Sequence, residues 1–522
     1  MASSILHQWL SLVGAIWLQS INGTNSNFPA YSSQLKQLLS ISQIQLNNLA
    51  FASDAGKLLG WLSGVAAVYL PLWLVLLIGA TLGLVGYGLQ YLFITNQISS
   101  ISYAHIFLLT VLAGNSICWI NTVCYVVIIR NFPLDYRQVA VGITTSYLGL
   151  SAKVYTVVVN AIYSSTTERA KAYLLFNSVF PLIACVLASP LVRGINSVGN
   201  SRKMKGGFTV MFLITIATGI YAIIGSFGSV LKRLAPLNNL IGMVTCLLLP
   251  LVIPLVEKMR DVLAGEWWLN KEIKVHSSII EENTIDLEKI ENENASDQNR
   301  EEAVKEEIGV KLMLQRVEFW LYFFVYFFGA TLGLVFLNNL GQIAESRGYS
   351  GTSSLVSLSS SFGFFGRLIP SLLDYVFSRS YKYMIPSPAS IAALMAPMAG
   401  AFILLLNKSN IALYTSTAII GVCTGAITSI SVSTTTELFG SKNFSVNHNV
   451  VVANISIGSF LFGYLAALVY RKQGNYEDGK CMGMDCYRNT FILWGSCCFF
   501  GTFLALILYA RTRKFYSQRC CM

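Results

Sequence analysis

The stretch 71-PLWLVLLIGATLGLVGYGLQYLFI-94 contains no charged residue and is rich in leucine, glycine and aromatic side chains. A helix needs about 20 such residues to cross the hydrocarbon core of a bilayer. Runs of similar length and character recur along all 522 residues. Only helices and closed barrels satisfy their backbone in lipid, and these runs are too long for barrel strands. We therefore predict an all-α polytopic membrane protein.

The composition agrees with this prediction and excludes other classes. The chain is 54% hydrophobic and only 12% charged, whereas soluble proteins are about 25% charged. The net charge is +11, but the acidic residues are unevenly distributed, because 15 of the 25 lie between 257 and 316. The basic residues elsewhere flank apolar runs, which suits contact with anionic lipid better than nucleic acid. No nucleic acid partner is predicted.

The apolar runs predict about 14 membrane spans, arranged as six, two and six. These spans cover residues 6–24, 43–68, 71–94, 104–130, 138–163, 170–192, 208–228, 237–256, 317–340, 352–376, 386–406, 409–436, 447–470 and 489–510. Two groups of six are typical of secondary transporters built from two bundles around a central pathway.

Four regions follow from this pattern. They are a six-helix bundle (1–205), two additional spans (206–256), an acidic linker (257–316) and a second six-helix bundle (317–522). The linker is too poor in apolar residues to fold alone, so it is a solvated tether or a docking segment for regulatory proteins. The distribution of Lys and Arg favours a cytosolic linker and cytosolic termini. The endoplasmic reticulum or the plasma membrane is the expected location.

Two opposite charges stand inside the second span, in 51-FASDAGKLLGWLSG-64. Asp54 and Lys57 share a helix face and can neutralise each other. A charge within the membrane costs several kcal/mol and usually marks a functional path, although a purely structural pair remains the alternative. Gly56, Gly60 and Gly64 fall on one face and predict close helix packing.

Other polar residues inside spans are further candidates for a substrate or coupling path. Lys153 has no acidic residue nearby in the sequence, and Arg367 has Asp374 seven residues on as an alternative partner. Asn115 and Asn339 can donate and accept hydrogen bonds, although bonding between helices is the alternative for both.

Neither a metal site nor an enzyme active site is predicted. The 11 cysteines lie mostly inside spans, there are four histidines, and no metal-binding spacing or nucleophile–base set is present. No cofactor is expected. Cys481 and Cys486 lie in a loop predicted on the non-cytosolic side, where an oxidising compartment permits a disulfide.

Several strings resemble a known family of plant membrane proteins. In the first half these strings are 31-YSSQLKQLLSISQIQLNNLAFASDAGKLLGWLSG-64, 121-NTVCYVVIIRNFP-133 and 146-SYLGLSAKVYT-156. In the second half they are 337-LNNLGQIAESRGYSGTSSLVSLSSSFGFFGRLIPSLLD-374, 436-TELFGSKNFSVNHN-449 and 481-CMGMDCYRNTF-491. The first set is similar to the nodulin-like domain and the second to nuclear fusion defective 4-like proteins of the major facilitator superfamily. The resemblance covers the chain from about Gln19 to Thr512, apart from the linker.

The resemblance implies a major facilitator-type fold with two extra helices. It also implies transport of a small polar solute, for which the charged span residues favour an anion and coupling to protons. A non-transporting scaffold or receptor with the same fold is the alternative.

Two departures from the facilitator pattern bear on this choice. A charged loop that locks the two bundles on the cytosolic side usually follows the second span, but Gly64 stands where its aspartate would sit. The corresponding loop of the second half retains Arg367, Asp374 and Arg379, so Asp374 and Arg379 are predicted to form a cytosolic gate. Thr145 stands where the nodulin-like pattern often has a lysine, and Lys153 lies eight positions later.

Overall fold

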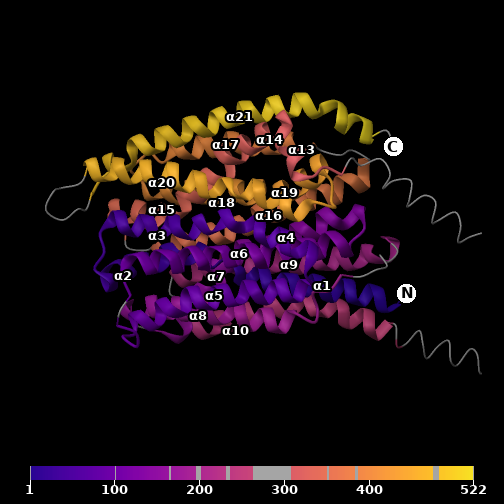
Figure 1. Cartoon of the computed structure of the whole chain (residues 1–522), viewed down its shortest axis with the longest axis horizontal. Helices are drawn as coiled ribbons and strands as arrows, with labels where there is room; N and C mark the ends of the chain where they lie inside the picture. Colours follow the sequence, from indigo (N-terminus) through magenta and orange to yellow (C-terminus); the bar gives the residue numbers. More distant parts are fainter. Residues whose placement is uncertain are drawn as a thin grey trace, which may run out of the picture.

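Helices that run roughly along one long axis make up the computed structural model (Figure 1). It describes residues 2–520 except 100, 164–165, 195–200, 231–234, 261, 263–306, 350–351, 382–385 and 474–480. The first half supplies α1 (Ala2–Asn22), α2 (Phe28–Leu39), α3 (Gln43–Ala55), α4 (Gly60–Tyr69), α5 (Leu72–Ile94), α6 (Tyr103–Asn131), α7 (Leu134–Ile162), α8 (Thr166–Ala188), α9 (Ser201–Val230) and α10 (Pro236–Leu248). The second half supplies α13 (Val310–Gln315), α14 (Val317–Tyr326), α15 (Leu332–Ser346), α16 (Thr352–Tyr381), α17 (Ser387–Leu404), α18 (Asn410–Phe439), α19 (Phe444–Val452), α20 (Asn454–Gln473) and α21 (Asp485–Cys520).

The two halves lie side by side, each with its own apolar core. The core of the second half is lined by aromatic residues of α14, α17 and α21, including Phe319, Phe402 and Trp494. The core of the first half gathers around Trp9 and Phe132. Helices α7 and α16 pack along each other and form a large part of the boundary between the halves.

Ten described helices are long and apolar enough to cross a membrane, so the protein is an integral multi-pass membrane protein. Four predicted spans are not among the ten, namely 6–24, 43–68, 138–163 and 352–376. Three of these four carry Asp54, Lys57, Lys153 or Arg367, and their helices lie along the boundary between the halves. Polar residues that face a protein interior lower the mean hydropathy of such helices. The total of about 14 spans therefore remains a prediction.

The predicted span 43–68 is not one continuous helix. A 3₁₀ turn, η2 (Gly56–Leu59), separates α3 from α4. The glycine packing face is confirmed, because a Cβ at Gly56 would lie 2.2 Å from the carbonyl oxygen of Val111 in α6. A Cβ at Gly64 would lie 2.6 Å from the carbonyl oxygen of Ser445 in α19. The turn and the glycines thus allow this segment to contact α6 and the second half with its backbone.

The two ends of the helix array differ in what they carry (Figure 1). The end with the N-terminus and α13 is called the linker end below. The opposite end, with α2 and the start of α21, is called the disulfide end, because Cys481 and Cys486 are joined there with their Cα atoms 5.8 Å apart.

The last residues of the predicted linker 257–316 are part of the second half. The Glu307 carboxylate accepts hydrogen bonds from the backbone N–H groups of Ser441 (3.2 Å) and Lys442 (2.9 Å) between α18 and α19. The Ile308 N–H donates to the Phe439 carbonyl at 3.1 Å, and the Asn447 side chain donates to the Ile308 carbonyl at 2.9 Å. We call this set of bonds the Glu307 clasp. It is followed directly by α13, so residues 307 and 308 contact the second half, and the linker bounds 257–316 stay a prediction.

Candidate functional site

The predicted pair of opposite charges in the second span lies at the boundary between the halves. Asp54 is the last residue but one of α3, and Lys57 lies in the turn η2, with 2.5 Å between Lys57 Nζ and Asp54 Oδ1. Both side chains are buried. The 3₁₀ turn keeps them one turn apart on the same face, so the ammonium neutralises the carboxylate without a longer-range partner.

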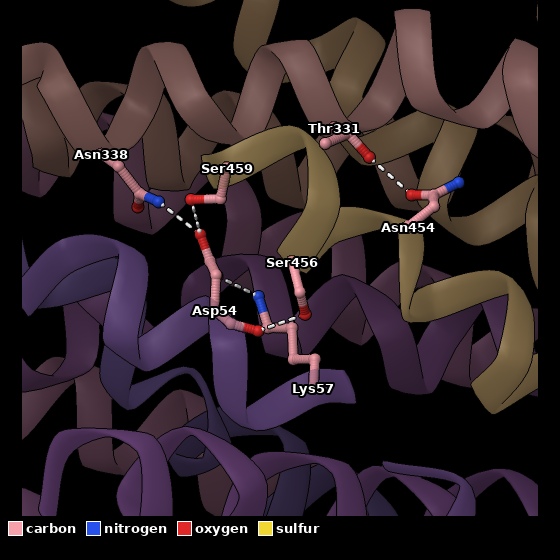
Figure 2. Close-up of polar contacts among 7 residues, drawn as sticks. All are labelled: Asp54, Lys57, Thr331, Asn338, Asn454, Ser456 and Ser459. Carbon is pink, nitrogen blue, oxygen red and sulfur yellow. Dashed lines mark hydrogen bonds and ion pairs between the residues drawn. The ribbon is translucent and has the colours of Figure 1, made fainter. Parts of the chain in front are cut away.

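The same carboxylate also binds the second half of the chain (Figure 2). Its Oδ2 atom accepts hydrogen bonds from Asn338 Nδ2 in α15 at 2.8 Å and from Ser459 Oγ in α20 at 2.7 Å. Ser456 Oγ, also in α20, donates to the backbone carbonyl of Asp54 at 2.6 Å. Hydrogen bonds to an ionised acceptor are about twice as strong as neutral ones. One titratable group therefore holds Lys57 and connects the two halves.

The second-half partners are themselves held in place by a neighbouring bond. Thr331 Oγ1, in the π turn between α14 and α15, donates to Asn454 Oδ1 at the start of α20 at 2.8 Å. This bond joins the two helices that supply Asn338 and Ser459. The donors to Asp54 are thus presented by a connected pair of helices.

Contacts between the halves continue from Asp54 towards the disulfide end. Gln342, one turn after Asn338 in α15, donates to Asn47 of α3. Tyr487 at the start of α21 donates to Gln342 Oε1 at 2.8 Å. The bonds of Asp54 and the Gln342–Asn47 bond form a polar junction between the halves on the disulfide side, and Tyr487 holds Gln342 from within the second half.

A separate junction lies towards the linker end. Ser445 Oγ donates to the Gly64 carbonyl at 3.1 Å, and Asn449 Nδ2 of α19 donates to Thr122 Oγ1 of α6 at 2.9 Å. The position of the missing lock aspartate is thus occupied by a glycine whose backbone touches α19 directly. A neutral backbone contact joins the halves where the facilitator pattern would have a charged loop.

Two adjoining cavities lie between the halves, with volumes of about 60 and 110 Å³. The smaller one is lined by Asp54 and Asn338, and the larger one by Lys57. Arg367 of α16 lines both. Water needs about 10–15 Å³ of such volume, so the larger cavity has room for a small solute. The structure therefore brings three predicted path residues, Asp54, Lys57 and Arg367, to one internal space.

Lys153 is buried on α7, and it lines neither cavity. Its backbone N–H donates to Ser360 Oγ of α16 at 3.3 Å, and that hydroxyl donates to the Gly149 carbonyl at 2.5 Å. Lys153 forms no ion pair with any residue that the structure describes. The residue therefore lies at the packed α7–α16 boundary, near the cavities and not in their walls.

The two predicted asparagines bond within the helix packing. Asn115 Nδ2 donates to the Gly56 carbonyl at 2.9 Å and its Oδ1 accepts from Trp119. Asn339 Nδ2 donates to Val335 of its own helix at 2.8 Å. Neither side chain lines a cavity. Asn338 occupies the position that was predicted for Asn339, because residues 334, 338 and 342 share the face of α15 towards the first half.

The predicted cytosolic gate is only partly described. Asp374 is half-buried in α16, and the side chain of Arg379 lies outside the described part of the chain. Arg367 donates to the carbonyl of Gly363 and not to Asp374, which removes the alternative contact considered for it. A gate formed by Asp374 and Arg379 stays a prediction. Among the described residues, no three His, Cys, Asp or Glu side chains come together as a metal site would require.

Comparison with known proteins matches both halves of the chain to described families. Residues 8–256 match the Nodulin-like family model, and residues 301–518 match the model of the NFD4 C-terminal domain. The Arabidopsis thaliana protein NUCLEAR FUSION DEFECTIVE 4 is 38% identical over 535 residues, which span 98% of this chain and 90% of that protein.

Solved structures of transporters share the fold. One is a proton dependent oligopeptide transporter, at 13% identity and a TM-score of 0.55, covering 98% of this chain and all of that one. Another is the major facilitator superfamily proton:xylose symporter XylE bound to 6-bromo-6-deoxy-D-glucose, at 12% identity and a TM-score of 0.55, covering 98% and 96%. The fold is therefore of the major facilitator type.

Proposed function

Because the chain belongs to the family of nodulin-like and nuclear fusion defective 4 proteins and has a major facilitator-type fold, we propose that it is a secondary transporter. It moves a small polar, anionic solute across a membrane by alternating access between its two halves. The observation that carries the proposal is the position of Asp54, whose carboxylate holds Lys57, lines a cavity and bonds Asn338 and Ser459 of the other half.

This position supplies a physical route for proton coupling. A protonated Asp54 no longer attracts Lys57 and accepts weaker hydrogen bonds from the second half. Protonation therefore weakens the junction on the disulfide side and favours opening there. Deprotonation restores the junction, and a proton gradient biases the populations of the two states by its differential effect on them.

The scaffold alternative is less well supported than transport. The feature in favour of a scaffold is the absence of the charged loop that usually follows the second span. The contact of Gly64 with Ser445 joins the halves at that place without a charge. A transporter can therefore lack the lock and still close on the linker side.

The direct test is uptake by the purified full-length protein in proteoliposomes. A panel of small organic acids, neutral sugars and amino acids is offered with and without a pH gradient, and empty liposomes serve as the control. We expect solute-dependent flux that rises several-fold when the gradient is imposed. Absence of flux for the whole panel from correctly folded protein would favour the scaffold reading instead.

The linker end is proposed to face the cytosol, with the disulfide end on the opposite side. We then expect Cys481 and Cys486 to be oxidised in protein purified without reductant. Mass-shift labelling of thiols measures this, with the buried Cys118 and Cys124 as internal references for free cysteines after denaturation. Two labelled thiols in the 481–491 peptide would contradict the disulfide and remove the support that it gives to this orientation. Most of the predicted linker 257–316, namely residues 263–306, lies outside the described part of the chain, so its docking role stays a prediction.

A further inference from the structure

Arg367 of α16 is a half-buried charged side chain that has no charged partner among the residues that the structure describes. Its Nη1 donates to the Gly363 carbonyl of its own helix at 3.3 Å, and it forms no ion pair among the described residues. A guanidinium carries five N–H donors in a planar fork that fits a carboxylate. A charge that is partly withdrawn from water is stabilised when a counter-ion binds to it. Most of its donors therefore remain available to a bound anion.

Two glycines make room for this guanidinium. A Cβ at Gly149 of α7 would lie 2.8 Å from Arg367 Nη1, and a Cβ at Gly363 of α16 would lie 3.3 Å from it. A side chain at Gly149 would displace the guanidinium. The tight α7–α16 contact thus sets the position of the charge at the wall that the two cavities share.

Tyrosines from both halves stand beside the same charge. Tyr125 of α6 and Tyr326 of α14 line the larger cavity together with Arg367. The Tyr125 hydroxyl has no hydrogen-bond partner among the residues that the structure describes. A phenolic hydroxyl can donate to an oxyanion. Arg367 and Tyr125 therefore offer donors from α16 and α6 to one bound group.

The remaining wall of the larger cavity combines an apolar surface with neutral polar groups. Its apolar part comes from α6, α7, α15, α19 and α20, namely Ile117, Leu148, Leu334, Phe444, Val452 and Ile455. Neutral polar residues complete the wall, namely Asn25, Ser26, Asn121, Thr122, Thr428, Ser431, Ser445, His448 and Asn449. Small-molecule sites typically combine such walls with a few polar groups that fix orientation. An inorganic ion would leave this surface without a partner, whereas an apolar body attached to the anionic group would cover it.

The charges around the cavities limit the charge of the occupant. The charged side chains that line them are Asp54, Lys57 and Arg367. Asp54 and Lys57 neutralise each other at 2.5 Å, so one positive charge remains. A single negative charge complements this wall, and a second one would be buried unpaired.

We propose that the larger cavity binds a small organic monoanion, with one carboxylate on Arg367 and Tyr125 and an apolar body against α6 and α20. This assignment rests on the proposed transport function for its role but concerns binding alone. The proposal predicts that the cavity binds such a monoanion in preference to neutral sugars, dianions and inorganic phosphate.

Binding is tested on the purified full-length protein by the shift of its thermal unfolding midpoint. The probes are benzoate and 3-methylbutanoate, each compared with its neutral amide, together with phthalate and inorganic phosphate. We expect saturable stabilisation by the two monocarboxylates and at least a tenfold weaker effect of the other probes. Equal stabilisation by carboxylate and amide would overturn the proposal, as would preference for phosphate.

Variants locate the site. Tyr125→Phe keeps the ring and removes the hydroxyl, and we expect it to weaken binding about tenfold, as for the loss of a hydrogen bond to a charged group. Arg367→Lys keeps the charge and loses the fork, and it should weaken binding by at least as much. Arg471→Gln, on the exposed end of α20, is the control and should bind as the natural chain does. Unchanged affinity in both site variants would overturn the assignment.

The outcome is distinguishable from that of the transport test. Monocarboxylate binding without any flux supports this site and contradicts the proposed function. Flux of another solute, with no stabilisation by the monocarboxylates, overturns this site and leaves the transporter proposal standing.

Discussion

Asp54→Asn is expected to abolish the effect of a pH gradient on uptake and to lower the stability of the protein. The amide cannot titrate, so the junction with Asn338 and Ser459 no longer responds to protons. The change also leaves the Lys57 ammonium buried without its counter-charge. Breaking a buried pair in this way typically costs about 3–5 kcal/mol. Gradient-driven uptake in proteoliposomes and thermal unfolding measure the two effects.

The double variant Asp54→Asn with Lys57→Met separates coupling from folding. It replaces the stranded ammonium by an apolar side chain of similar length, so stability and yield should recover. The response to the gradient should not recover, because no titratable group remains at this position. Normal gradient-driven accumulation by a well-folded Asp54→Asn protein would rule out the coupling role of Asp54.

Gly64→Val is expected to open the protein towards the linker end. A Cβ at this position would lie 2.6 Å from the Ser445 carbonyl oxygen and 3.0 Å from the Val446 Cα. Both are backbone atoms, which cannot rotate away, so α4 and α19 must separate. Overpacking of this kind costs about 1–3 kcal/mol, which shifts a two-state population by roughly 5- to 150-fold.

The native cysteine Cys118 reports on this change. It is a free, buried thiol that lines the larger cavity, so its alkylation rate in sealed vesicles should rise in Gly64→Val. Gly463→Val in α20 is the matched control, because a Cβ there meets no atom within 4 Å. An unchanged Cys118 rate in Gly64→Val would show that the glycine contact does not close the linker side.

Much of the fold follows from the sequence because lipid imposes a simple rule on every span. Long uncharged runs must be helices, and six runs on each side of an additional pair predict two bundles. The packing role of Gly56, Gly60 and Gly64 could also be predicted, because glycines on one helix face allow another helix to approach closely. The 3₁₀ turn at Gly56–Leu59 was not predicted. It depends on the fit between α3 and α6, and it does not alter the hydropathy pattern of the sequence.

The charged residues of the site could be predicted from the sequence, whereas most of the neutral residues that contact them could not. Asp54, Lys57 and Arg367 stand out because charges in apolar runs are rare. Asn338 and Asn339 are adjacent, and only the face of α15 decides which one reaches Asp54. A spacing of four between Leu334, Asn338 and Gln342 carries that signal. Ser459 and Tyr125 have no such signal, because hydroxyls and tyrosines are common in helix packing.

The Glu307 clasp bears on how the two halves of the chain are joined. The carboxylate and the Ile308 backbone fasten the start of the second half to the turn before α19, and α19 is the helix that meets Gly64. Because these bonds fix residues 307 and 308 to the turn before α19, we expect changes in the length of residues 263–306 to leave the register of the helices around the cavities unchanged.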